Sequence, residues 1–240
     1  MSAPPVPGVF LTAEWRHLLM VNYAVDPAVL EPLVPAGTEL DLWHDRAYVS
    51  VVGFRFLRTR VLGIPVPFHR NFDEVNLRFY VRRRAEDGWR KGVAFVKEIV
   101  PRRAIAFVAR TLYNENYVRL PMRSAVAIPS AVRYEWWHAG SWESVSATAA
   151  GEPYLPAADS EEAFISEHYW GYARQRDGST VAYGVEHPPW RVWRCEAPAL
   201  ACEVANLYGE RFAPLLSGPP ASAFVAEGSR VVVRRGVWVR

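Results

Sequence analysis

FDEVNLRFYVRRR (residues 72–84), EDGWRKGVAFVKEIV (86–100) and PRRAIAFVARTLYNENYVRLPM (101–122) are the segments that decide the fold. In the first segment apolar and polar residues alternate, which is the period of a β-strand with one apolar face. The apolar face carries Val75, Leu77, Phe79 and Val81. The opposite face carries Glu74, Asn76, Arg78, Tyr80 and Arg82. A polar strand face either meets solvent or lines a cavity, and the pattern by itself leaves both open.

The next two segments extend this strand into a larger unit. Asp87-Gly88 predicts a tight hairpin turn, because this pair tolerates positive φ. Residues 89–100 then read as a second strand that is apolar on both faces around residues 93–96. After Pro101, residues 102–114 carry one apolar stripe at helical spacing and are predicted to form a helix.

The rest of the chain predicts short strands separated by turn residues. Hairpins are expected at 39–43/47–57, 132–137/141–148, 169–176/180–186 and, at the end of the chain, 223–226/230–239. Strands are also expected at 15–24 and 117–128, and a loop at 151–160. Short helices should begin after Asp26 and Ser160, which are good N-cap residues, and 201–213 is also predicted to be helical. Because strands and helices do not alternate regularly, a doubly wound parallel sheet is disfavoured. We predict a mainly β, α+β fold of mostly antiparallel strands.

Composition narrows the class of protein. The 240 residues fit a flexible arm over residues 1–9 followed by a single domain over 10–240. A net charge of +3 without a concentrated basic face argues against a nucleic-acid partner. Neither a signal peptide nor a long apolar segment is evident, so a cytoplasmic protein without a membrane partner is expected. Cys195 and Cys202 lack the spacing of a zinc site and are expected to be free thiols.

Several motifs together resemble a known family. WRHLLMVNYAVDPAVLEPLVPAG (15–37), FDEVNLRFYV (72–81), GVAFVKEIVPRRAIAFVARTLYNENY (92–117) and FISEHYWGY (164–172) are similar to the YqjF-like family, which carries a domain of unknown function. The resemblance covers residues 10–240. It implies the acetoacetate decarboxylase-like fold, a β-rich cone or barrel with a few peripheral helices. No particular reaction is implied.

The resemblance also allows one mechanism to be tested on residues. Acetoacetate decarboxylase forms a Schiff base through a lysine whose pKa is lowered by a second lysine. The corresponding positions here are near Tyr117, Val118 and Arg119, and none of them is a lysine. A guanidinium stays protonated and cannot act as the nucleophile, so this mechanism is not expected. A glutamate on the preceding strand of the decarboxylase is similar to Glu74.

The candidate site follows from a polar strand face that lines a barrel cavity. Glu74 is the candidate catalytic acid or base, and Arg78 or Arg110 is expected to clamp a carboxylate. An internal salt bridge to Glu74 or Glu98 is an equally weighted alternative for both arginines. The other candidate ligand-binding residues are Asn76, Tyr80, Tyr113, Tyr117, His168 and Tyr169.

Other chemistries find less support. Lys97 lies in an apolar strand, and an ion-paired or snorkelling lysine is the favoured interpretation. The histidines are scattered one to a segment, so no metal site is predicted, and no cofactor is implied. Tryptophan and tyrosine side chains are expected to wall a mainly apolar pocket for a small molecule.

Two functions remain open from the residues. One is an enzyme acting on a small organic (oxo) acid or apolar metabolite without a Schiff base. The other is a non-catalytic ligand-binding, sensing or interaction protein on the same fold. Self-association is a general expectation for such proteins, and no segment specifies it.

Overall fold

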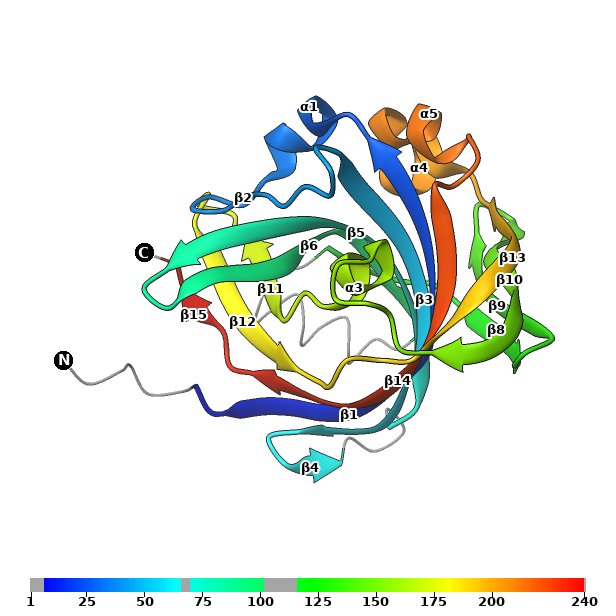
Figure 1. Cartoon of the computed structure of the whole chain (residues 1–240), viewed down its shortest axis with the longest axis horizontal. Coiled ribbons are helices and arrows are strands. Elements are labelled where there is room, and N and C mark those ends of the chain that lie inside the picture. The colour runs from blue at the N-terminus through cyan, green and yellow to red at the C-terminus, as the bar shows by residue number, and fades with distance from the viewer. Residues whose placement is uncertain (1–6, 66–69, 102–115, 240) are drawn as a thin grey trace.

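The computed structural model describes residues 7–65, 70–101 and 116–239, and within them the chain forms a 15-stranded sheet with short helices at its margins (Figure 1). The strands are β1 (Val9–Val25), β2 (Glu39–Leu40), β3 (Ala47–Val61), β4 (Ile64–Pro65), β5 (Phe72–Ala85), β6 (Gly88–Val100), β7 (Tyr117–Arg119), β8 (Met122–Ala127), β9 (Ala131–His138), β10 (Ser141–Tyr154), β11 (Trp170–Arg174), β12 (Thr180–Glu186), β13 (Val192–Ala201), β14 (Ser222–Arg234) and β15 (Val237–Trp238). The helices are α1 (Pro27–Leu30), α3 (Glu161–Ser166), α4 (Val204–Tyr208) and α5 (Ala213–Leu216), with 3₁₀ turns η1 (Glu31–Leu33) and η2 (Glu210–Phe212).

The sheet closes into a barrel. Its strands run in the order β12, β11, β6, β5, β3, β1 and β14, and β12 also pairs with β14. All neighbours in this ring are antiparallel except β6 and β11. Closure pairs the strand edges and creates an interior face. The predicted mainly β, mostly antiparallel architecture is confirmed.

A second layer covers one side of the barrel. From β14 the sheet continues through β13, β10, β9 and β8, and α4 and α5 lie at its end (Figure 1). The apolar face of β5 is buried in the core beneath this layer, where Leu77 and Phe79 lie among residues of β9 and β10. Tyr134 of β9 packs directly on Gly53, where an added Cβ would lie 2.5 Å from the tyrosine ring. The opposite face of β5 is therefore the one that faces the barrel interior.

Two strands change face by a local distortion of the backbone. His17 in β1 and Arg58 in β3 both have φ of 55°, and the β1–β3 register shifts between Thr12 and Glu14 and again between Arg16 and Leu19. As a result Trp15 and Leu18 both point inward from β1, although strict alternation would place them on opposite faces. Such bulges bend strands and increase their twist, which helps a sheet to close.

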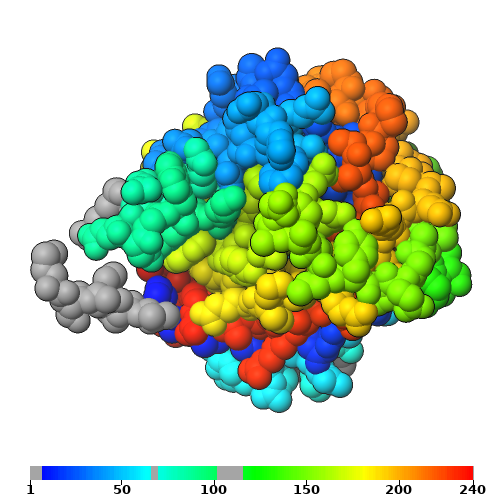
Figure 2. Space-filling view, viewed as in Figure 1, coloured from blue at the N-terminus to red at the C-terminus, as the bar shows by residue number. Residues whose placement is uncertain are grey.

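Helix α3 closes one end of the barrel. Ser160 caps it by accepting a hydrogen bond from the Ala163 amide at 3.2 Å, as predicted. Its Phe164 and Ile165 are buried with the barrel interior. Figures 1 and 2 show α3 and the chain after it in the middle of the view, beside the β5–β6 hairpin. Across the described segments, the helices are too short or too polar to span a membrane.

Some predicted elements are wrong in detail. β2 pairs with β5 instead of forming a hairpin with β3, because the intervening turn closes locally through Trp43 and Arg46. Residues 223–226 and 230–234, expected in two strands of the final hairpin, lie in one continuous strand, β14, which passes through Gly228 at φ +79° and pairs with β1. The end of the second expected segment forms the separate strand β15, which pairs with β12. The strand expected over 117–128 is split into β7 and β8 at Pro121, which cannot donate to a ladder. The expected loop at 151–160 is shorter, because β10 continues to Tyr154. The helix predicted at 102–114 lies outside the described residues.

Candidate functional site

The barrel interior contains a cavity of about 170 Å³. A cavity of roughly 150 Å³ is large enough for a benzene-sized ligand, so this one suits a small organic molecule. Every strand of the barrel ring contributes to its wall, and most of the wall is apolar. The apolar and aromatic lining residues include Phe10, Leu11, Trp15, Leu18, Phe54, Phe56, Val61, Phe72, Val93, Phe95, Trp170, Tyr183, Val185, Trp190 and Val233.

The polar face of β5 supplies the charged part of the wall. Glu74, Asn76 and Arg78 line the cavity, so this part of the polar face is internal. Glu74 and Asn76 are each only 2% exposed. Because side chains two residues apart share a strand face, these three groups are aligned along one line of the wall.

Glu74 is held by its neighbours. Its Oε1 accepts a hydrogen bond from Asn76 Nδ2 at 3.0 Å, and its Oε2 accepts one from the Tyr117 hydroxyl at 3.5 Å. Glu98 of β6 lines the same cavity and is 1% exposed, and its Cα pairs in register with Asn76. Two carboxyl groups are therefore buried in adjacent strands. Such a pair is stable only with a shared proton or a nearby cation.

Among the described residues, no carboxylate pairs with Arg78. Its Nη2 donates to the Ile165 carbonyl at 3.3 Å and contacts the Met20 sulfur at 3.8 Å, while its guanidinium lies 5.7 Å from the Tyr80 ring centroid. Its Nε is buried without a hydrogen-bond acceptor in the part of the chain that is described. The alternative of an internal salt bridge to Glu74 or Glu98 is therefore not realised for Arg78 within the described part of the chain.

His168 is fixed by a carboxylate that sequence reasoning did not identify. Its Nε2 lies 3.1 Å from Asp41 Oδ2, and both side chains are 2% exposed. Asp41 also lies 3.4 Å from Lys91 and 3.8 Å from Arg82. Burial opposes ionisation of Asp41, but the hydrogen bond from His168 and the nearby cations outweigh it and lower its pKa. Burial lowers the pKa of His168 more than Asp41 raises it, and Lys91 and Arg78 add to the lowering.

The remaining predicted site residues are dispersed. Tyr117 lines the cavity and contacts Glu74. Tyr80 is buried beside the cavity, and its hydroxyl lies 2.6 Å from Ser50 Oγ. Tyr169 lies in a second, neighbouring pocket, where its ring packs 4.8 Å from His187. Arg110 and Tyr113 lie outside the described residues.

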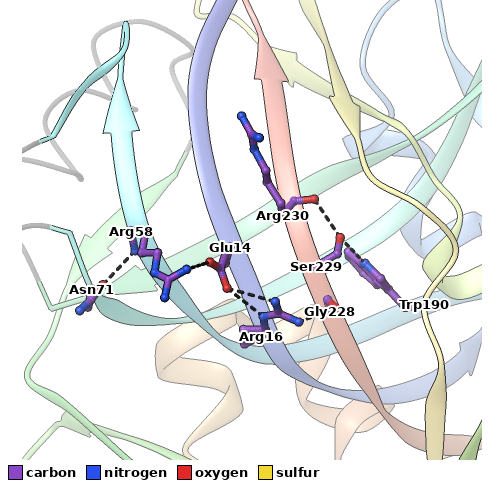
Figure 3. A network of polar contacts seen from close by, with 8 residues as sticks. All are labelled: Glu14, Arg16, Arg58, Asn71, Trp190, Gly228, Ser229 and Arg230. Atoms are coloured by element: carbon purple, nitrogen blue, oxygen red, sulfur yellow. Dashed lines mark hydrogen bonds and ion pairs between the residues drawn. The ribbon is translucent and has the colours of Figure 1, made fainter.

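His187 and Trp190 form a rigid part of the wall that sequence reasoning did not predict as a unit. Their rings stack at 3.9 Å with an interplanar angle of 15°. The indole Nε1 of Trp190 donates to Ser229 Oγ at 2.9 Å, next to the Glu14–Arg16–Arg58 ion-pair network on the outer surface (Figure 3). Burial lowers the pKa of His187 to about 4, so the imidazole is neutral at pH 7.

The structure locates the nucleophile candidates away from the cavity. The chain has only two lysines, and neither Lys91 nor Lys97 is among the residues that line the cavity. Lys97 donates to the Leu207 carbonyl, and burial lowers its pKa. Burial raises the pKa of both Cys195 and Cys202 to about 12, so neither thiol is ionised at neutral pH. Over the described ranges, no cluster of His, Cys, Asp and Glu is arranged to hold a metal ion.

Asp41 and Glu98 are the functional candidates missed by the sequence prediction. From the sequence, Glu98 is expected only as a salt-bridge partner, although Glu98 lies in a strand that is otherwise rich in apolar residues. A charged residue within an apolar strand is a signal that could have identified it. Asp41 gave no comparable signal, because it lies next to the short strand β2 and 127 residues from its histidine.

Comparison with known sequences gives two matches over most of the chain. The model of DUF2071, described as an uncharacterized conserved protein, matches residues 12–230. The uncharacterized protein YqjF of Bacillus subtilis (strain 168) is 27% identical over 207 residues, covering 84% of this chain and 83% of its own.

Comparison with solved structures identifies the fold. Acetoacetate decarboxylase from Legionella pneumophila superposes with a TM-score of 0.68 at 13% identity, covering 100% of this chain and 92% of its own. The enduracididine biosynthesis enzyme MppR in complex with pyruvate gives 0.66 at 13% identity, with coverage of 99% and 92%. An acetoacetate decarboxylase-like enzyme from Sphingomonas wittichii RW1 gives 0.65 at 13% identity, with coverage of 100% and 97%. At this identity the likeness establishes the fold alone, which is the acetoacetate decarboxylase-like fold.

Proposed function

Since this chain belongs to the DUF2071 family and has the acetoacetate decarboxylase-like fold, we propose that it binds a small organic acid inside its barrel. We propose further that the protein transfers a proton to or from this acid. Arg78 binds the carboxylate of the ligand, and the aromatic wall holds its apolar body. Glu74 is the acid or base. No Schiff base is involved, because neither lysine of the chain lines the cavity.

The observation that carries this proposal is that the partly buried guanidinium of Arg78 has no carboxylate partner among the described residues. A guanidinium that is partly removed from water is normally paired with a carboxylate. Arg78 instead lines an apolar cavity and is held by a carbonyl and a sulfur, neither of which compensates its charge. Its fork of donors suits a bidentate carboxylate. A bound organic acid supplies the missing negative charge.

Glu74 is suited to proton transfer because it is buried, oriented and close to the cavity. Asn76 and Tyr117 position its two oxygens from different strands. A carboxylate placed in this way can take a proton from the carbon next to a carbonyl group and return it to the same carbon or a neighbouring atom. The low water content of an apolar cavity strengthens its interaction with the charge that develops on the ligand.

The comparisons support the size and polarity of the ligand without identifying it. One protein of this fold is named for decarboxylating acetoacetate, and another binds pyruvate. Both are small oxo acids, of the size that a 170 Å³ cavity accommodates. The lysine mechanism of acetoacetate decarboxylase does not extend to this chain, which makes its reaction a separate question.

Arg78→Met tests the carboxylate site. We expect it to weaken the binding of short-chain carboxylic acids, measured by calorimetry, by roughly 10- to 100-fold, the value of a charge-assisted hydrogen bond. Arg84→Met is the matched control, since Arg84 lies on the same strand but is exposed and packs on Trp89. Equal affinities for the two variants would refute the assignment of Arg78.

Glu74→Gln tests the acid–base role. The assay is exchange of carbon-bound hydrogen of the acid into deuterium oxide, followed by proton NMR, which requires no knowledge of the overall reaction. We expect the wild-type protein to accelerate this exchange and Glu74→Gln to abolish it. An unchanged exchange rate in Glu74→Gln would remove Glu74 from the mechanism.

A non-catalytic ligand-binding protein is the second candidate. It is favoured by one observation, which is that both oxygens of Glu74 already accept hydrogen bonds within the protein. A purely structural Glu74 would bind no proton of the ligand. This candidate predicts Arg78-dependent binding of acids without any hydrogen exchange, in the wild-type protein and in Glu74→Gln alike.

A further inference from the structure

Four side chains in a row along β5 line the cavity, and they are Phe72, Glu74, Asn76 and Arg78. They occupy alternate positions of one strand. Because a strand rises about 3.4 Å per residue, the first and the last of these residues leave the backbone about 20 Å apart. The cavity therefore has two distinct ends on this strand, a charged end at Arg78 and an apolar end at Phe72.

The guanidinium of Arg78 leans away from the apolar end. It lies 5.7 Å from the ring centroid of Tyr80, which is the next residue beyond Arg78 on this face of β5. Its Nη2 also donates a hydrogen bond to the Ile165 carbonyl of α3, the helix that closes one end of the barrel. A carboxylate bound by Arg78 is therefore held at the α3 end of the cavity.

The apolar end is a packed cluster of aromatic rings. Phe72 and Phe56 stack with their centroids 4.5 Å apart and an interplanar angle of 11°. Phe54 and Trp15 contact Phe56 with centroid distances of 5.1 and 5.6 Å, and all four residues line the cavity. Rings that pack on one another form a fixed wall against which an apolar group is removed from water. This aromatic cluster suits the apolar end of a ligand.

The wall between the two ends carries polar groups that already engage one another. Asn76 Nδ2 donates to Glu74 Oε1 at 3.0 Å, and the Tyr117 hydroxyl donates to Glu74 Oε2 at 3.5 Å. The middle of a ligand therefore needs no hydrogen-bonding group to satisfy them. A cavity of about 170 Å³ that extends along this length is narrow, which favours a chain over a compact body.

We propose that the ligand is an elongated carboxylic acid whose carboxylate binds Arg78 and whose apolar end reaches the aromatic cluster. The side chains at both ends fill part of the length, so a distance on the order of 10 Å remains to be spanned. An extended hydrocarbon chain advances about 1.3 Å per carbon, so this distance corresponds to about eight carbons. Short oxo acids reach only the charged end. This inference rests on the proposed function and adds the length of the acid.

The position of Glu74 then determines which part of the acid reacts. Glu74 lies four residues from Arg78, about 14 Å along β5, so it faces a carbon far from the carboxylate. The reacting carbon is therefore next to a distal oxo group. Its C–H bond breaks, the proton moves to the Glu74 carboxylate, and the electron pair forms the enolate of the oxo group. Return of a proton from Glu74 to the same carbon completes the exchange.

A series of unbranched acids from butanoate to dodecanoate, titrated into the full-length protein by calorimetry, tests the length. We expect the affinity to rise roughly fourfold with each added methylene up to about eight carbons and then to stop rising. In Phe72→Leu, whose side chain is shorter, the affinity should rise for about one or two more carbons. Phe79→Leu is the matched control, because Phe79 lies on the same strand but faces the core. Its plateau should stay at the wild-type length.

The results separate this inference from the proposed function. An affinity that stays level beyond butanoate, while Arg78→Met still weakens it, would exclude an elongated ligand and leave the proposed function intact. A rise through dodecanoate without a plateau, or the same plateau in Phe72→Leu and the wild-type protein, would remove the aromatic cluster as the end of the site. Binding of no acid by the folded wild-type protein would overturn both.

Two isomeric acids test the position of the reacting carbon in the wild-type protein, without any substitution. 2-Oxooctanoate and 7-oxooctanoate have the same length and composition and differ only in the place of the oxo group. In deuterium oxide we expect accelerated exchange of the hydrogens beside the 7-oxo group and no acceleration beside the 2-oxo group. Faster exchange in 2-oxooctanoate, or accelerated exchange in neither isomer, would overturn the distal position of the reacting carbon.

Discussion

Replacement of His187 by phenylalanine should make the protein less sensitive to acid. Burial lowers the pKa of His187 to about 4, against an ordinary value of 6.5, while the Pro188 carbonyl at 2.9 Å opposes the shift and Arg78 adds to it. The unfolded chain therefore binds a proton at this residue before the folded chain does. The stability contributed by the neutral ring is present above pH 6.5 and is lost as the pH falls from 6.5 toward 4.

The size of this effect follows from the two pKa values. When the pH falls from 7 to 4.5, protonation of His187 alone should lower the free energy of unfolding by about 2 kcal/mol. Phenylalanine retains an aromatic ring for the 3.9 Å stack on Trp190 but cannot bind a proton. The loss of stability between pH 7 and pH 4.5 should therefore be about 2 kcal/mol smaller in His187→Phe than in the wild-type protein.

Urea unfolding at the two pH values, followed by tryptophan fluorescence, measures this difference. Comparing the variants cancels the contributions of other groups, including Asp41 and His168, provided that the m-values agree. His187→Gln should behave like His187→Phe in its response to pH. His44→Phe, at an exposed turn, is the control and should follow the wild-type protein. An equal loss of stability in the wild-type protein and His187→Phe would show that burial of His187 is not linked to protonation.

Three further predictions concern the barrel and its chemistry. Gly228→Ala should destabilise the protein by more than about 2 kcal/mol in urea unfolding, because Gly228 has φ +79° and the new Cβ would lie 2.0 Å from the Trp15 carbonyl oxygen. Gly218→Ala is the control and should be nearly neutral, because no atom lies within 4 Å of its added Cβ. Equal losses of stability in the two variants would contradict this prediction. Tyr80→Phe should cost about 1 kcal/mol, because Ser50 Oγ keeps its hydrogen bond to Asn22 Oδ1 at 2.6 Å but loses the one it shares with the tyrosine hydroxyl at 2.6 Å. An unchanged midpoint would count against that bond. Pyruvate with borohydride should leave the intact mass unchanged, and an adduct at Lys97 would restore the Schiff-base mechanism.

Much of the local structure could be predicted from the sequence because its causes are local. The alternation in residues 72–82, the Asp87-Gly88 turn and the caps at Asp26 and Ser160 all depend on residues a few positions apart. The errors occurred where pairing is non-local. β2 joined β5 instead of its neighbour in sequence, and β14 stayed continuous because it pairs along nearly its whole length with β1.

The candidate site was predictable only in part. The grouping of Glu74, Asn76 and Arg78 follows from strand periodicity, and all three line the cavity. Tyr169 and Tyr117 are both expected from the sequence to wall the pocket, because both are tyrosines near other candidate site residues. Tyr169 nevertheless lies in a neighbouring pocket, since its position depends on the path of the chain after α3. No pattern relates Asp41 to His168, because a short strand and a loop from distant parts of the chain bring them within 3.1 Å.

The amino-acid sequence alone determined that the chain is rich in strands, that one strand has a polar face, and that a lysine mechanism has only Lys91 and Lys97 available. The tertiary structure decided that the polar face is internal, because β12 pairs with β14 and closes the sheet around it. It also decided that Arg78 meets no carboxylate of the described segments, whereas His168 meets one. Periodicity describes the order of side chains along one strand, whereas these contacts depend on the register, bending and closure of strands that are far apart in the chain.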